Sequence, residues 1–401
     1  MAYTYEPEII SRQSAVGPQW VCCTNRAMLG AAQSSGAHLQ ATYRCSYFTT
    51  TRGTVNAMRL VYANVFNNAT GEEDSTTQPL IVKVAIEANS TAYPVFFNGQ
   101  REGVIAPGSF LISDPVGILL AANTQFWVRT AHQTTFGTEK WATASFSMDS
   151  TNLGESFATN PRDQVDGTST LTSGSNANLV GPVAIQGLID VIDPVDAVII
   201  GSSSSVGQGD TAETPTWDWG YLSRWLSNRI GHFKISRATQ TVAQWTGTAH
   251  TRRMALLAAL KPTYAIVQMG ANDWAAGTSV ATQQANLTIL YNQLDALGIR
   301  VIGQTYTPIT TSSDSWTSVS GQNRHGEEQL RLGINTWIRT RPAPLWGYVE
   351  VTDLVETRRN SGIFKAPGWT ADGTHLTQQA HRYIGEQLTA KGEDIRLRMS
   401  T

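Results

Sequence analysis

The pattern of apolar residues changes at about residue 180, and this change limits the folds that the 401-residue chain can adopt. Before it, short apolar runs such as Met58–Asn64 and Leu80–Ile86 are separated by clusters of Gly, Asn, Asp, Ser and Pro. Such spacing is typical of short antiparallel strands joined by polar turns. We therefore predict an all-β domain of the sandwich or jelly-roll type over residues 1–180, with Asp149–Asn178 as a polar linker.

After residue 180, apolar runs alternate with amphipathic helical patterns. This alternation indicates a doubly wound parallel sheet over residues 181–401, in which ligands bind at the carboxyl ends of the strands. The clearest predicted strands are Asp196–Gly201, Tyr264–Met269 and Arg300–Thr305, and the predicted helices are Trp219–Arg229, His250–Leu260, Ser279–Leu297, Gln322–Ile338 and Gln378–Lys391.

The charge balance excludes several classes of protein. A formal net charge of -2 provides no global basic field, which argues against a dedicated nucleic-acid binder. No apolar run approaches the ~20 residues that a membrane helix needs, so we expect no membrane span. The N-terminus lacks the basic start and apolar stretch of a signal peptide. We favour an extracellular or virion-associated location, which the protein would reach by another route.

The three cysteines, Cys22, Cys23 and Cys45, lie in the first fifth of the chain. An odd number rules out a full disulfide framework. One bridge from Cys45 to Cys22 or Cys23 stays open, and reduced thiols in the core are the favoured interpretation. No Cys/His spacing resembles a zinc site, so we predict no metal.

Three predicted strand or helix boundaries carry residues suited to acyl transfer. The Ser-rich turn Gly201–Gly207 can expose a nucleophilic hydroxyl next to free backbone N–H groups. The turn Gly270–Asp273 places Asn272 where its amide can face a developing negative charge. In Asp372–His375, the Asp can accept from the imidazole Nδ1–H, which leaves Nε2 to face a nucleophile.

Together these motifs resemble the SGNH/GDSL hydrolase family, over about Val195–Lys391. Ser203 occupies the position of the nucleophile in the first block, Gly270–Asp273 matches the Gly-x-Asn-Asp block in full, and Asp372–His375 matches the Asp-x-x-His block. The resemblance implies a flavodoxin-like doubly wound sheet and a serine esterase with a Ser203–His375–Asp372 triad. It implies neither a cofactor nor a metal.

Two positions depart from the family pattern. Ser202 replaces the Asp of the Gly-Asp-Ser block, although that Asp is not the acid of the triad. In the second block, Arg237 stands where the family has a Gly whose N–H enters the oxyanion hole. The predicted oxyanion donors are therefore Ser203 N–H, Arg237 N–H and the Asn272 amide, unless a neighbour replaces Arg237. The Arg237 guanidinium would either bind a substrate carboxylate or face outward from a helix start.

We predict removal of a short acyl group, with O-acetyl on a polysaccharide as the first choice. Gly270 and Trp274 are the predicted substrate contacts, and the N-terminal domain would bind or dock carbohydrate. The alternative is a glycan-binding virion or cell-surface protein whose SGNH domain is degenerate. The sequence leaves a homo-oligomer open. Aromatic side chains near the strand ends could stack on sugar rings, and they belong to Trp217, Trp219, Trp274, Trp316 and Trp369.

Overall fold

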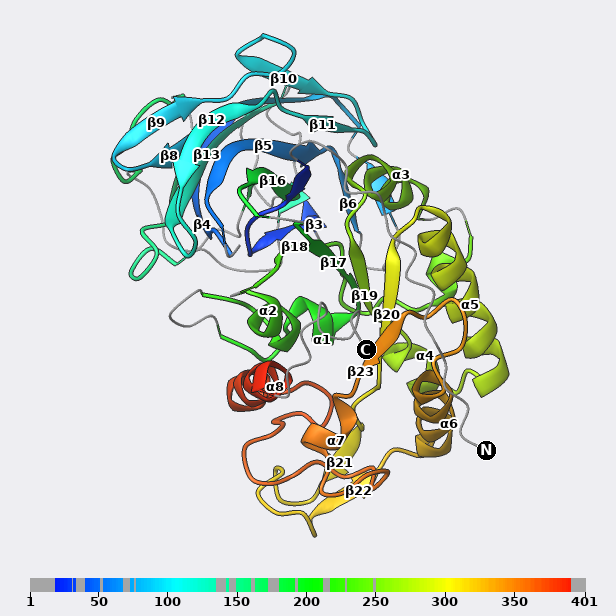
Figure 1. The fold of residues 1–401 in the computed structure, drawn as a ribbon. Helices are drawn as coiled ribbons and strands as arrows, with labels where there is room; N and C mark the ends of the chain where they lie inside the picture. The colour runs from blue at the N-terminus through cyan, green and yellow to red at the C-terminus, as the bar shows by residue number, and fades with distance from the viewer. Residues whose placement is uncertain are drawn as a thin grey trace.

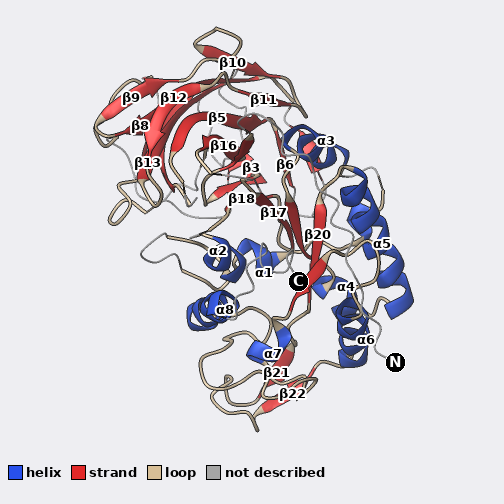
Figure 2. Ribbon diagram, viewed as in Figure 1, coloured by secondary structure: helices blue, strands red, loops and turns tan. Residues whose placement is uncertain are grey.

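The computed structural model describes residues 19–30, 32–33, 40–50, 53–67, 73–75, 77–134, 142–143, 149–159, 163–171, 180–191, 194–211, 217–227, 229–247 and 250–390. Within these ranges, a β-rich region built mainly from the first half of the chain lies against an α/β region built from the second half (Figure 1). Figure 2 shows that the long helices are confined to the α/β region. The predicted change of structural class within the chain is therefore confirmed.

Two antiparallel sheets form most of the β-rich region. They share one apolar cluster, which explains the alternation of buried and exposed residues along strands such as Val116–Leu120. One sheet contains β1 (Trp20–Cys22), β16 (Ala184–Ile189), β5 (Val55–Ala63), β11 (Phe110–Ile112) and β12 (Val116–Leu120). The other contains β10 (Glu102–Ile105), β8 (Leu80–Ala88), β9 (Thr91–Pro94), β13 (Gln125–Gln133), β4 (Gln40–Phe48) and β15 (Ser156–Thr159). Two short pairs are β3 (Ala32–Gln33) with β14 (Ala142–Thr143) and β6 (Val65–Asn67) with β7 (Glu73–Ser75).

Two features of this region differ from the sequence prediction. The stretch Asp149–Asn178 is not only a linker, because its residues 156–159 form β15 and pair with β4. Glu155 and Val165 in the same stretch are buried. The strand β16, which lies beyond residue 180, pairs with β1 and β5. We therefore propose a boundary between β16 and the next strand, in place of the predicted one at 180/181.

The C-terminal region contains the predicted doubly wound parallel sheet. Its strand order is β2-β18-β17-β19-β20-β23, and all neighbouring pairs are parallel. Without the edge strand β2, this is the flavodoxin-like order 2-1-3-4-5. The strands are β2 (Ala27–Met28), β18 (Gly231–Lys234), β17 (Asp196–Gly201), β19 (Tyr264–Gln268), β20 (Arg300–Gln304) and β23 (Gly347–Val349). A separate hairpin contains β21 (Thr310–Ser312) and β22 (Gln322–Arg324).

Helices cover both faces of the parallel sheet, on the left and right of the strands in Figure 1. Successive residues of β17 belong to different apolar clusters, as expected where a strand is buried on both faces. Val198 belongs to the cluster that includes residues of α3, α5 and α6, and Ile199 to the one that includes residues of α2, α7 and α8. The helices are α1 (Ser203–Val206), α2 (Tyr221–Leu226), α3 (Thr251–Leu260), α4 (Ala271–Ala275), α5 (Val280–Ala296), α6 (Glu328–Arg339), α7 (Thr352–Val355) and α8 (Gln378–Ala390), with the 3₁₀ turn η1 (Ala243–Trp245).

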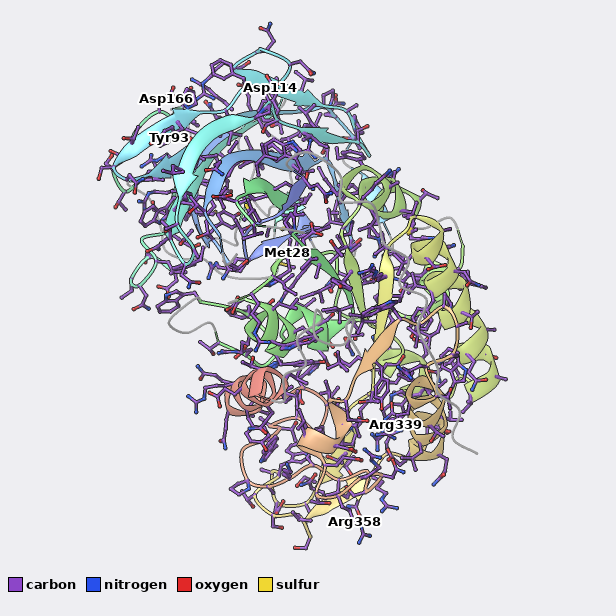
Figure 3. All side chains as sticks on the ribbon, viewed as in Figure 1. Met28, Tyr93, Asp114, Asp166, Arg339 and Arg358 are labelled. Carbon is purple, nitrogen blue, oxygen red and sulfur yellow. The ribbon has the colours of Figure 1, made fainter. Side chains whose placement is uncertain are left out.

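The edge strand β2 joins the two regions. It comes from the N-terminal part of the chain, yet it pairs with β18 of the parallel sheet, and Figure 3 shows its Met28 where the two regions meet. Backbone hydrogen bonds flank the pairing, from Leu29 N–H to Lys234 O at 2.8 Å and from His232 N–H to Thr24 O at 2.8 Å. The buried carboxylate of Asp196 accepts from the Cys22 N–H at 2.7 Å. The two regions therefore share backbone pairing, which two independent domains on a linker would not.

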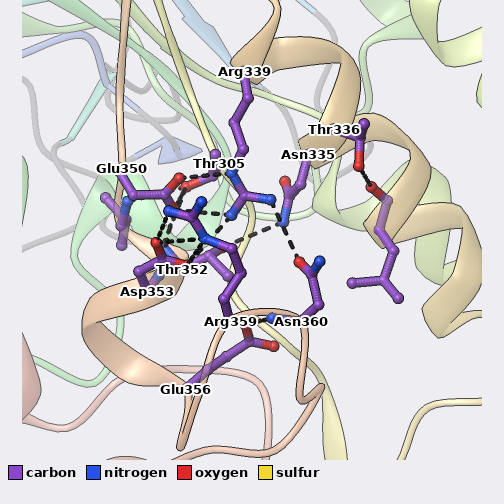
Figure 4. Close-up of polar contacts among 12 residues, drawn as sticks. Thr305, Asn335, Thr336, Arg339, Glu350, Thr352, Asp353, Glu356, Arg359 and Asn360 are labelled. Atoms are coloured by element: carbon purple, nitrogen blue, oxygen red, sulfur yellow. Dashed lines mark hydrogen bonds and ion pairs between the residues drawn. The ribbon is translucent and has the colours of Figure 1, made fainter.

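An ion-pair network holds the far edge of the parallel sheet (Figure 4). Glu350, which follows β23, accepts from the Arg339 guanidinium at 2.7 Å and from Thr305 Oγ1 at 2.7 Å. Asp353 on α7 pairs with Arg339 and with the more exposed Arg359. The network links α6, α7 and the ends of β20 and β23, at the side of the sheet opposite β2.

The three cysteines are free and buried, in agreement with the favoured interpretation. None of the helices within the described ranges is both long enough and apolar enough to cross a membrane.

Candidate active site

The predicted site residues lie at the carboxyl ends of neighbouring parallel strands. Ser203 follows β17, and Asn272 follows β19. These two adjacent strands are the point where the strand order reverses, which is where doubly wound sheets form a crevice for ligands. His375 lies in the loop that precedes α8. The fold therefore brings together three segments that are separated by up to 172 positions in the sequence.

Ser203, His375 and Asp372 form an unbroken hydrogen-bonded chain. The His375 Nε2 lies 2.9 Å from Ser203 Oγ, and its Nδ1 lies 2.7 Å from Asp372 Oδ2. Both distances lie in the normal hydrogen-bond range. With Nδ1–H directed at the carboxylate, Nε2 carries the lone pair that can accept the serine proton.

The Asp372 carboxylate is also held by the backbone of its own loop. Its Oδ1 accepts from the N–H of His375 at 2.7 Å and of Thr374 at 2.8 Å. Partial burial raises the pKa of Asp372, but these N–H groups and the imidazole outweigh it, so the pKa lies below its usual value. The carboxylate therefore remains ionised at neutral pH, as an acid that orients a histidine must.

Ser202 stands where the resembled family has an Asp beside the nucleophile, and it forms a neutral hydrogen-bonded pair with Gln268. Its side chain is buried, and its hydroxyl and N–H lie 3.2 Å from the amide oxygen of Gln268 on β19. The pair anchors the start of α1 to the neighbouring strand. The replacement of Asp therefore leaves the backbone of the nucleophile turn supported.

The structure contradicts the predicted oxyanion role of Arg237. Its backbone N–H donates to the Gly201 carbonyl at 2.9 Å, which continues the β17–β18 pairing. A donor used in the sheet is not available to a substrate oxygen. The side chain turns toward the β-rich region, where Nε donates to the Asn67 carbonyl of β6 at 3.1 Å. Arg237 therefore connects the two regions, and this contact does not favour either predicted role of its guanidinium.

Two residues further on, Thr239 has the backbone conformation that glycine prefers. Its φ is +69°, in the left-handed region that a β-branched residue rarely adopts. Glycine adopts such a conformation without strain, so Thr239 is a second candidate, beside Arg237, for the position where the resembled family has its Gly. Sequence reasoning missed Thr239 because threonine does not signal a positive φ.

Asn272 and Asp273 hold the segment that follows Thr239. The Asn272 side-chain amide donates one hydrogen to the Gln240 carbonyl at 2.8 Å, which leaves its second N–H for another acceptor. The Asp273 carboxylate accepts from the Val242 N–H at 3.0 Å. Burial raises the pKa of Asp273, against the opposing effect of this hydrogen bond. The segment Gly270–Asp273 after β19 therefore positions residues 240–242 after β18.

The structure does not support Trp274 as a substrate contact. Its side chain is completely buried, and its ring packs edge-on against His325 with the centroids 5.3 Å apart. Gly270 also has a packing role. Its φ is +125°, and a Cβ atom there would lie 2.7 Å from the Tyr306 hydroxyl. Both residues shape the turn that presents Asn272.

A buried lysine lies behind the nucleophile helix. Lys234, the last residue of β18, donates from Nζ to the Val206 carbonyl at 3.2 Å and to the Trp219 carbonyl. Burial lowers the pKa of Lys234 to about 7, against the opposing effect of the carboxylates of Asp218 and Asp210. No sequence pattern had marked this residue.

Among the described residues, no group of three or more His, Cys, Asp or Glu side chains is arranged to hold a metal ion. The chemistry that the arrangement supports is nucleophilic attack by a serine hydroxyl.

One family model matches the part of the chain that contains these residues. The model of the GDSL-like lipase/acylhydrolase family matches residues 199–383, just under half of the chain. No curated protein matches the chain.

Solved structures resemble the same half of the chain at low identity. A GDSL-like lipase from Bacteroides thetaiotaomicron is 17% identical, with 49% of this chain and 88% of that chain covered and a TM-score of 0.36. A carbohydrate acetylesterase from Sinorhizobium meliloti is 15% identical over 50% of this chain and 99% of its own, with a TM-score of 0.33. A psychrotrophic esterase from Pseudoalteromonas sp. is 16% identical over 51% and 100%, with a TM-score of 0.34. The assignment rests on the family model: residues 199–383 form a domain that belongs to the GDSL-like lipase/acylhydrolase family.

Proposed function

We propose that the protein is a serine esterase in which Ser203, His375 and Asp372 are the catalytic triad. The observation that carries this proposal is the continuous hydrogen-bonded chain from Asp372 through His375 to Ser203 Oγ. The family of residues 199–383 supports ester hydrolysis as the reaction. The non-catalytic alternative would need a Ser203 hydroxyl that His375 cannot reach, and the 2.9 Å contact argues against it.

In this mechanism His375 Nε2 takes the proton of Ser203 as Oγ attacks the ester carbonyl. The imidazolium then gives that proton to the leaving alcohol as the C–O bond breaks, which leaves an acyl-enzyme on Ser203. Water, deprotonated by His375, attacks the acyl-enzyme and releases the acid and the serine. Asp372 keeps the imidazole in the required tautomer and stabilises its charged form.

The tetrahedral oxyanion would be stabilised by three N–H groups. These are the backbone N–H of Ser203, the second side-chain N–H of Asn272 and the backbone N–H of Thr239, which replaces Arg237 in the set. The positive φ of Thr239 and the contact from Asn272 to Gln240 support this assignment, because together they fix the backbone that follows β18.

The favoured substrate remains a short acyl group, O-acetyl first, on a carbohydrate. The test of the reaction is hydrolysis of 4-nitrophenyl acetate and butyrate by the wild-type protein, Ser203→Ala and Ser204→Ala. Ser204 is the neighbouring hydroxyl on α1 and serves as the matched control. We expect acetate-preferring activity that disappears in Ser203→Ala and persists in Ser204→Ala. Activity that survives in Ser203→Ala would refute the assignment of the nucleophile.

A further inference from the structure

The ring of Trp316 contacts the loop that carries both Asp372 and His375. A Cβ atom built on Gly373, between these two residues, would lie 2.7 Å from Trp316 Cζ2 and even closer to the Thr310 carbonyl. The Thr310 N–H donates to the Gly373 carbonyl at 2.8 Å. The hairpin of β21 and β22 therefore lies directly against the catalytic loop, and Gly373, at φ +76°, permits this approach.

Other tryptophans near the strand ends have different surroundings. Trp274 is buried, and the Trp219 ring packs against Gly207 at the end of α1. The Trp369 ring packs against Tyr383, and the Lys365 ammonium lies 4.8 Å from its centroid. These rings contribute to packing.

The Trp316 side chain is held in place before any ligand arrives. Its indole Nε1–H donates to Thr310 Oγ1 at 2.9 Å, and its backbone N–H donates to Ser312 Oγ at 2.9 Å. Ser315 and Trp316 have φ values of +57° and +59°, a pair of strained conformations that the loop maintains. The Asp314 carboxylate stabilises the loop by accepting from the Ser318 N–H at 3.0 Å.

The ring is also partly open to solvent. Trp316 is only half-buried, and the same loop presents Val319, which is 45% exposed and one of the few large apolar residues on the described surface. A fixed, partly exposed indole, on a loop that also carries an exposed apolar side chain, is a surface on which the C–H face of a sugar ring can stack.

Position determines which part of an ester would meet this surface. His375 must give its proton to the leaving alcohol, so the alcohol oxygen lies next to Nε2 in the reacting complex. The acyl oxygen lies instead toward Asn272. Trp316 contacts the backbone between Asp372 and His375, so its ring lies against the segment that carries the histidine.

We infer that Trp316 is a specificity-determining platform that binds the pyranose ring of the alcohol part of the substrate, so that esters of carbohydrates are preferred over esters of small alcohols. This inference rests on the proposed esterase function of the same site. It assigns the sugar contact to the β21–β22 hairpin and not to Trp274.

The test compares Trp316→Ala and Trp316→Phe on glucose pentaacetate and on ethyl acetate, whose alcohol has no ring. We expect kcat/KM for glucose pentaacetate to fall by about tenfold or more in Trp316→Ala, mainly through KM, with partial recovery in Trp316→Phe. Ethyl acetate hydrolysis should stay within about twofold. Equal losses on both substrates, or no loss on glucose pentaacetate, would overturn the inference.

Trp346→Ala is the matched control. Trp346 is also half-buried, but it precedes β23 and thus lies at the amino end of the strands, opposite the site. It should leave the ratio of the two activities unchanged.

A binding measurement distinguishes a failure of this inference from a failure of the proposed esterase function. Calorimetric titration of glucose pentaacetate into Ser203→Ala, with and without Trp316→Ala, measures the platform without turnover. If the wild-type protein hydrolyses neither ester, the esterase proposal fails, and the titration still decides the role of Trp316. An affinity that is equal in both proteins would refute the platform.

Discussion

Glycine substitutions at Arg237 and Thr239 should have opposite effects on stability, because one backbone is strained and the other is not. The left-handed φ of +69° at Thr239 costs on the order of 1–3 kcal/mol for a residue with a Cβ branch. Glycine removes this strain but adds about 0.5–1 kcal/mol of conformational entropy to the unfolded chain. Thr239 is exposed, so few contacts are lost. Thr239→Gly should therefore stabilise the fold by about 1 kcal/mol.

Arg237→Gly should instead destabilise it. Arg237 does not have a positive φ, so glycine relieves no strain there. The substitution removes the hydrogen bond from Nε to the Asn67 carbonyl at 3.1 Å. A hydrogen bond from a charged donor contributes about 1.5–3 kcal/mol, and the partial exposure of Arg237 lowers this to about 1–2 kcal/mol.

Urea denaturation of the two variants and the wild-type protein measures both effects, and turnover of 4-nitrophenyl acetate shows whether the site survives. Thr239→Gly should keep kcat within a few-fold, because glycine still supplies the backbone N–H. A stabilised Arg237→Gly, or a Thr239→Gly that loses more than about 1 kcal/mol, would refute Thr239 as the better candidate for the Gly position.

Three further perturbations test the surroundings of the site. Asn272→Ala should lower kcat for 4-nitrophenyl acetate by on the order of 10²–10³, because it removes a proposed oxyanion donor and the hold on the segment after β18; a loss below tenfold would contradict this. The lowered pKa of Lys234, about 7, means that the unfolded state binds more protons than the folded state up to the ordinary value of 10.5. The free energy of unfolding should therefore rise from pH 7 to pH 9 more steeply in the wild-type protein than in Lys234→Met, with a difference of a few kcal/mol at most. Equal pH dependence of the two proteins in urea denaturation would refute the lowered pKa of Lys234. Glu350→Ala should cost about 1–3 kcal/mol in the same assay because Thr305 and the partly buried Arg339 lose hydrogen bonds to its carboxylate. Arg359→Ala, with a side chain 60% exposed, should change stability by less than about 0.5 kcal/mol, and equal effects would contradict this difference in burial.

Local sequence signals determined much of the α/β region. The apolar run Asp196–Gly201 matches β17 in full, because a strand buried on both faces is continuously apolar. The predicted helix Ser279–Leu297 corresponds to α5, since Ser279 caps its first turn by accepting from the Thr282 N–H and Gly298 follows its end at φ +77°. The residue pattern also placed the Ser-rich turn Gly201–Gly207, Asn272 and the Asp372–His375 pair at strand ends and in a loop, and the family resemblance singled out Ser203 within that turn.

Tertiary structure decided what depends on partners distant in the sequence. A two-residue strand such as β2 has too little pattern to be recognised, and its place beside β18 follows from its register with that strand. The conformation of Thr239 and the burial of Trp274 likewise depend on surrounding segments, because φ and solvent exposure are properties of the packed backbone. The sequence therefore determined which chemical groups this protein has and in what order. Only the packing of its two regions decided that the Arg237 N–H is used in the sheet and that the Trp316 ring contacts the loop of Asp372 and His375.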